Sequence, residues 1–157
     1  MGKILSRGLL ALYLGILIWL VLFKLQYNIA SVLNYHHRSL NLIPFDAPSR
    51  EMIDNVIIFI PFGVLLNVNF KKVKFLPKLA YILVFSLTVE LIQSIFAIGA
   101  TDITDIITNT VGGFLGLKLY GLINKYINNK KLDKIIIFVG TLLLVLLLYY
   151  RTTLILQ

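Results

Sequence analysis

The chain has 157 residues, of which 59% are hydrophobic and only 14% are charged. A soluble domain carries roughly 25% charged residues, so most of this surface does not face water. The formal net charge of +8 comes from lysine clusters between apolar runs, without the interleaved aromatic side chains typical of nucleic-acid binding. The absence of cysteine excludes disulfides, thiolate nucleophiles and Cys-ligated metals.

Five apolar runs predict five transmembrane helices packed as an all-α bundle. The expected helices cover residues 9–23, 52–69, 79–97, 102–123 and 135–150, within a single membrane domain of residues 1–157. The first run follows Lys3 and Arg7, as the apolar part of a signal peptide would. Because residues 24–28 offer no small-residue cleavage site, we interpret this run as a retained first helix.

The longest segment between runs, residues 24–51, contains Pro44 and Pro48 and is expected to form an outer loop. In the second run, Pro61 lacks a backbone donor and frees the carbonyl of Ile57, which predicts a kink. A short turn at Gly99-Ala100-Thr101 joins the third and fourth runs. A connection of this length permits only an antiparallel helical hairpin.

The distribution of lysine predicts the orientation in the membrane. Cytoplasmic loops of membrane proteins carry an excess of Lys and Arg. We therefore expect a multi-pass membrane protein with the N-terminus and both lysine clusters inside and the C-terminus outside. The two clusters are Lys71, Lys72, Lys74 and Lys78, and Lys125, Lys130, Lys131 and Lys134.

Polar residues interrupt three apolar runs in their outer halves. Glu90 lies deep in the third run, where an ionised carboxylate is costly unless it is paired, protonated or in contact with water. Residues three or four positions apart share a helix face, which groups Glu90 with Gln93 and aligns the polar residues of the fourth run. We predict a ligand-binding site where these faces meet, formed by Asn55, Glu90, Gln93, Asp102, Asp105 and Asn109.

Several of these residues also have a purely structural interpretation. Asp102 and Asp105 begin a predicted helix, where a carboxylate is a normal cap and a favourable partner of the helix dipole. Asn55 could cap the second helix or cross-link two helices through its amide. Small residues let helices approach closely in membranes, and the residues expected to shape helix packing are Pro61, Gly63, Gly112, Gly113 and Gly116.

Four motifs follow one another along the chain: Asn41-Leu42-Ile43-Pro44-Phe45, Asn55-x-x-x-Phe59-x-Pro61-x-Gly63-x-Leu65-Leu66, Glu90-x-x-Gln93, and Asp102-x-x-Asp105-x-x-x-Asn109-Thr110-x-Gly112-Gly113-x-x-Gly116. In this order they resemble the VanZ-like family, over roughly residues 10–125. Members are bacterial membrane proteins named for teicoplanin resistance, so the resemblance implies a place in the bacterial cytoplasmic membrane and lowered susceptibility to glycopeptide antibiotics, especially the lipid-tailed teicoplanin.

One departure from the family pattern concerns the charge balance of the site. The family usually has an arginine just before the first aspartate of the fourth motif, where this chain has Gly99-Ala100-Thr101. An arginine there could pair with the acids. We expect Arg38 or Arg50 of the outer loop to take that role, with Asn41 as the third loop candidate.

Three functions fit these patterns. In the first, the polar cluster acts at the outer leaflet on an envelope component, such as a lipid-linked precursor, or on the glycopeptide itself. The second is an intramembrane enzyme acting on a lipid-linked substrate, with Glu90 or Asp105 as general base and a cation held by carboxylates. The third is a small proton-coupled transporter with Glu90 as proton relay.

The remaining expectations concern partners. The lipid bilayer is the expected environment, and a homo-oligomer formed through Gly112-x-x-x-Gly116 would be consistent with the small-residue stripe. The first interpretation requires no cofactor, no metal and no nucleic acid. No individual residue is assigned a catalytic role by the sequence.

Overall fold

The structure is a computed structural model, and it describes residues 2–23, 37–41, 43–46, 49–96 and 98–155. Within these residues five helices are present, which confirms the predicted helical architecture. Four of them, α1, α3, α4 and α5, are long and apolar enough to cross a membrane. The helices are α1 (Gly2–Phe23), α3 (Ser49–Asn69), α4 (Phe75–Phe96), α5 (Ile103–Ile123) and α6 (Asn129–Ile155).

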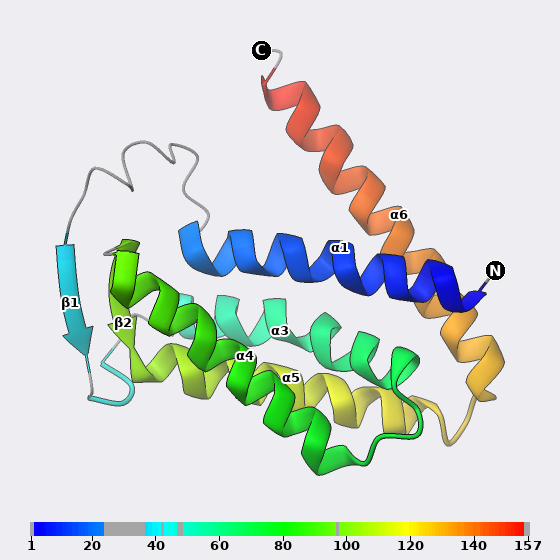
Figure 1. The fold of residues 1–157 in the computed structure, drawn as a ribbon. Helices are drawn as coiled ribbons and strands as arrows, with labels where there is room; N and C mark the ends of the chain where they lie inside the picture. The colour runs from blue at the N-terminus through cyan, green and yellow to red at the C-terminus, as the bar shows by residue number, and fades with distance from the viewer. Residues whose placement is uncertain (1, 24–36, 42, 47–48, 97, 156–157) are drawn as a thin grey trace.

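The four apolar helices run alongside one another in alternating directions (Figure 1). One end of this bundle, here called the strand end, holds two short strands and the N-terminal ends of α3 and α5. The opposite lysine end holds the chain's N-terminus and the connections 70–74 and 124–128. In Figure 1, α6 starts at the lysine end, crosses α1 and extends beyond the bundle.

Most helices begin earlier than the apolar runs indicated, which corrects their predicted bounds. An apolar run marks the part of a helix that lies in lipid, whereas the backbone continues its hydrogen-bonded turns into the polar interface. Thus α1 takes in Lys3 and Arg7, and α6 begins at Asn129. In α4, Pro77 lies in the first turn, where the missing N–H costs no helical hydrogen bond.

Helix α3 continues through Pro61. The carbonyl of Ile57 has no donor at position 61, because proline lacks an N–H. The neighbouring carbonyl, that of Ile58, accepts a hydrogen bond from the Tyr13 hydroxyl of α1. A side chain of the first helix therefore contacts the backbone of α3 one turn before its proline.

Two five-residue strands, β1 (His37–Asn41) and β2 (Ile98–Asp102), pair in parallel at the strand end. This corrects the prediction of helices alone: β1 lies in the predicted outer loop, and β2 replaces the predicted turn at 99–101. Strand pairing satisfies backbone N–H and C=O groups that an irregular segment near lipid would leave without partners. Residues 24–36 of the predicted loop lie outside the described residues.

Helices α3 and α5 form the central contact of the bundle. A Cβ added at Gly63, Gly112 or Gly116 would overlap a backbone carbonyl oxygen of the other helix. The two backbones therefore touch directly, without intervening side chains. Gly113 faces α4 instead, where an added Cβ would lie 2.6 Å from the side chain of Ile82. We call the contact between α3 and α5, formed by Gly63, Gly112 and Gly116, the glycine seam.

Aromatic rings fill the space between α3 and α4. Phe59 and Phe62 are fully buried, and Phe85 of α4 packs against both, with ring centroids 6.2 and 5.2 Å away. Leu17 and Val21 of α1 complete this apolar core. The core and the glycine seam together fix the faces from which polar side chains project at the strand end.

Candidate functional site

A hydrogen bond between α3 and α5 lies at the strand end, beyond the glycine seam. The Asn55 amide nitrogen donates to a carboxylate oxygen of Asp105 at 2.7 Å. Asp105 is only 3% exposed, and Asn55 is half-buried. Side-chain amides often cross-link helices in membranes through hydrogen bonds, and this pair joins α3 to α5 at the strand end.

A small pocket opens beside this pair and has a volume of about 90 Å³. Pockets that enclose whole drug-sized ligands measure about 300–1,000 Å³, so this one admits a single polar group of a larger molecule. Three carboxylates, one amide and three apolar side chains line it. The lining residues are Leu20, Val21, Glu51, Asp54, Asn55, Ile58 and Asp105.

Glu90 lies on α4 and faces the junction between β2 and α5. It is 2% exposed, and one of its carboxylate oxygens accepts the backbone N–H of Asp102 at 3.2 Å. Asp102 is the N-cap of α5, because its side chain accepts the backbone N–H of Thr104 at 2.7 Å. The structural alternative of a capping role therefore holds for Asp102.

The motif at residues 41–45 is tied to the start of α5. The Asn41 amide donates to the second carboxylate oxygen of Asp102 at 3.1 Å, and the backbone N–H of Phe45 donates to the Thr104 hydroxyl at 3.0 Å. Two of the motifs found in the sequence thus form one unit at the strand end. Asp102 joins this unit to Glu90.

Gln93 and Asn109 are fully buried and bond outside the predicted set. The Gln93 amide donates to the carbonyl of Val21 in α1 at 2.9 Å. The Asn109 amide donates to the hydroxyl of Ser86 in α4 at 3.0 Å. The amide oxygens of both side chains have no hydrogen-bond partner among the described residues. A buried acceptor without a partner can accept a hydrogen bond from a water molecule or from a donor group of a ligand.

Hydrogen bonds join four of the six predicted residues in two pairs. Asn55 bonds to Asp105 and Glu90 to Asp102, whereas Gln93 and Asn109 anchor α4 to its neighbours. The side chains that the prediction omitted are Glu51 and Asp54, which line the pocket. Their spacing of four residues from Asn55 and Ile58 places them on the same face of α3, which is the signal that could have found them.

The two candidate arginines are placed differently. Arg50 is exposed in the first turn of α3. Arg38 belongs to β1, and the strand register pairs its Cα with that of Gly99. Gly99 belongs to the segment where the family pattern has its arginine, so the backbone of Arg38 lies beside that segment. Glu90 and Asp105 each have an interaction partner.

Within the described residues, no group of three or more His, Cys, Asp or Glu side chains could hold a metal ion.

Four helices long and apolar enough to cross a membrane, with carboxylates and amides buried at one end, are typical of a helical membrane protein. The family model described as VanZ/LLP1 matches residues 10–124. The chain is 80% identical over 154 residues to Protein VanZ of Enterococcus faecium, covering 97% of this chain and 96% of that protein. The chain therefore belongs to the VanZ/LLP1 family, which confirms the resemblance found in the sequence. No solved structure matches it.

Proposed function

We propose that this protein lowers bacterial susceptibility to teicoplanin-type glycopeptide antibiotics by binding an envelope component at the outer face of the cytoplasmic membrane. Membership of the VanZ/LLP1 family supports the link to resistance. The lysine clusters support an orientation with the N-terminus and the lysine end inside. With α6 as a fifth membrane-spanning helix, the C-terminus then lies outside, and the strand end faces the outer leaflet.

The observation that carries this proposal is the partly buried Asn55–Asp105 pair beside a pocket with an acidic lining. Polar and ionisable side chains are costly inside a membrane, and those that are present usually serve binding or transport. Carboxylates accept hydrogen bonds and attract cations, so the pocket is suited to a donor group or a positive charge. Its volume of about 90 Å³ fits one such group of a lipid-linked envelope component, with the remainder outside.

The test compares susceptibility to teicoplanin and vancomycin in a sensitive host that expresses wild type, Asp105→Asn or Glu90→Gln. Both substitutions keep the shape of the side chain and remove its charge. We expect both to abolish protection against teicoplanin at unchanged membrane levels of the protein. The matched control is Asp46→Asn, an exposed carboxylate near the strand end, which should protect like wild type. Full protection by both site variants would refute a role for this cluster.

The second part of the proposal concerns the arginine that is expected to pair with the acidic residues of the site, and it gives this role to Arg38. An arginine on β1 beside Gly99 would replace the one that the family pattern places on the other strand. We expect Arg38→Ala to reduce teicoplanin protection, and Arg38→Ala with Gly99→Arg to restore it. Arg50→Ala, which removes an exposed arginine, should have no effect. Loss of protection with Arg50→Ala but not Arg38→Ala would assign the role to Arg50 instead.

A further inference from the structure

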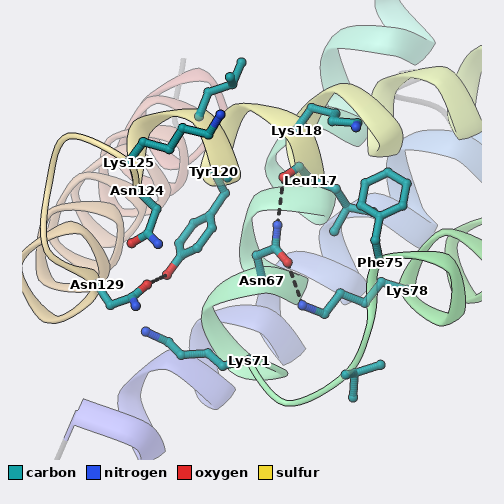
Figure 2. Close-up of a pocket in the computed structure, with 13 residues that line it drawn as sticks. Asn67, Lys71, Phe75, Lys78, Leu117, Lys118, Tyr120, Asn124, Lys125 and Asn129 are labelled. Carbon is teal, nitrogen blue, oxygen red and sulfur yellow. Dashed lines mark hydrogen bonds between the residues drawn. The ribbon is translucent and has the colours of Figure 1, made fainter.

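A second cavity, of about 550 Å³, lies at the lysine end of the bundle (Figure 2). It is bounded by the C-terminal part of α3, the connection 70–74, the start of α4 and the end of α5. Four lysines line it, and none of its lining residues is acidic. The four are Lys71, Lys78, Lys118 and Lys125.

Lys78 is the most informative of these side chains, because it is only 6% exposed. Its ammonium group donates to the Asn67 amide oxygen at 2.6 Å, and the Asn67 amide nitrogen donates to the carbonyl of Leu117 at 2.8 Å. Figure 2 shows Asn67 held between these two partners. Among the described residues, no carboxylate pairs with Lys78. A buried charge without an opposite charge is costly, so this arrangement favours an anion in the cavity.

The other three lysines are exposed at the edges of the cavity. Lys71 pairs with Asp133 of α6. The ammonium of Lys118 lies 5.0 Å from the ring centroid of Phe75 and 5.5 Å from that of Phe114. The orientation rule for membrane proteins accounts for exposed lysines, but it requires neither a buried lysine nor an amide that positions it.

The walls of the cavity are of two kinds. Amide side chains form one part, contributed by Asn67, Asn124 and Asn129, and apolar side chains form another, including Phe75 and Leu122. The side chain of Leu122 is 55% exposed on a helix of membrane-spanning length. The apolar wall thus continues onto an exposed apolar surface, which the acyl chain of an amphiphile could contact.

We propose that this cavity binds the phosphate group of an anionic phospholipid headgroup. Ammonium and amide donors supply the chemistry that a phosphate ester needs, and basic pockets between transmembrane helices commonly bind such headgroups. Free phosphate shares this chemistry, but the apolar wall beside Leu122 favours the lipid as its source. The cavity lies at the opposite end of α3 and α5 from the Asn55–Asp105 pair, so this proposal does not depend on the proposed resistance function.

The experiment measures lipid binding to the full-length protein in neutral detergent by native mass spectrometry. The probes are phosphatidylglycerol, phosphatidylcholine, inorganic phosphate and glycerol 3-phosphate. We expect phosphatidylglycerol to bind and to resist displacement by either soluble phosphate, and phosphatidylcholine to bind more weakly. Displacement of the lipid by inorganic phosphate or glycerol 3-phosphate at comparable concentrations would overturn the assignment to a lipid. Equal binding of the two lipids would overturn the anion site.

A charge-matched pair of double variants tests the location. Replacing Lys118 and Lys125 with Gln removes two charges from the cavity, whereas replacing Lys130 and Lys131 removes two exposed charges at the same end but outside it. Each lysine near an anionic lipid changes the affinity about fivefold. The cavity variant should therefore bind phosphatidylglycerol roughly 25-fold more weakly than wild type. The control variant should bind it with an affinity within about twofold of wild type. Lys78→Gln should lower affinity further, provided that its circular dichroism and elution volume match wild type. Equal losses in the two double variants would overturn the proposal.

Discussion

At the scale of single residues, the spacing of polar side chains along each helix was predictable, but their partners were not. Periodicity places Glu90 and Gln93 on one face of α4. It does not reveal that Gln93 reaches the backbone of α1 or that Asn109 reaches Ser86. These partners depend on how each helix is rotated about its axis, which is set by contacts between helices such as the glycine seam of α3 and α5.

The Asn55–Asp105 hydrogen bond leads to a prediction of energetic coupling. Polar pairs between membrane helices couple by about 0.6 kcal/mol on average and up to about 1.7 kcal/mol. Because Asp105 is buried and the bond is short, we expect a value in the upper half of that range from a double-mutant cycle of Asn55→Ala and Asp105→Ala. The coupling is obtained from the free energies of unfolding of the four proteins in mixed micelles. Asn69→Ala provides the control, because Asn69 lies at the other end of α3. Its effect on the free energy of unfolding should add to that of Asp105→Ala without coupling.

At the scale of elements, the long helices followed from hydrophobicity, whereas the two strands did not. The β2 segment, Ile-Gly-Ala-Thr-Asp, contains residue types that are depleted in strands, and β1 lacks an alternating apolar pattern. The two strands pair with each other, although they are far apart in the chain. Local sequence therefore carries little information about this pairing.

The strand register can be tested by cross-linking, because the chain has no cysteine of its own. Ser39 pairs with Ala100, and a disulfide requires Cα atoms about 4.4–6.8 Å apart. We expect Ser39→Cys with Ala100→Cys to cross-link under mild oxidation, as seen by mobility on non-reducing gels. Ser39→Cys with Thr101→Cys should not, because a shift of one residue places the second thiol on the opposite face. Cross-linking of only the shifted pair would show a different register.

The glycine seam predicts a difference between two substitutions in α5. Gly116→Ala places a Cβ against the Ile60 carbonyl and must separate the two helices, at a cost of about 1–3 kcal/mol. Gly121→Ala meets no atom within 4 Å and should change stability by less than about 1 kcal/mol, in the stabilising direction. Thermal unfolding in detergent compares them. A Gly116→Ala protein as stable as the Gly121→Ala protein would argue against a direct backbone contact.

At the scale of the whole molecule, composition alone indicated a helical membrane protein, and the antiparallel order of α4 and α5 followed from their short connection. The division of polar residues between two ends could also be read from the sequence, as acids and amides near one boundary and lysines near the other. The cavity at the lysine end could not be predicted from the sequence, because it forms only where the connection 70–74, α4 and α5 come together around Lys78.

The proposed orientation predicts which end of the molecule is accessible from outside the cell. Tyr126, at the lysine end, is 89% exposed, and Asp46 is exposed near the strand end. A membrane-impermeant maleimide should label Asp46→Cys in intact cells and Tyr126→Cys only after permeabilisation. The cysteine-free wild type gives the background. The reverse labelling pattern would invert the topology and place the acidic pocket inside the cell.

The direct backbone contact at Gly63, Gly112 and Gly116 has a consequence for how the gene tolerates variation. Every missense change in a glycine codon adds at least one carbon atom, so these three positions have no conservative replacement. Lipid-facing positions on the same helices accept any apolar residue of similar bulk. In a saturation-mutagenesis library selected for function, these three glycines should therefore tolerate almost no substitution. The lipid-facing positions beside them should tolerate many.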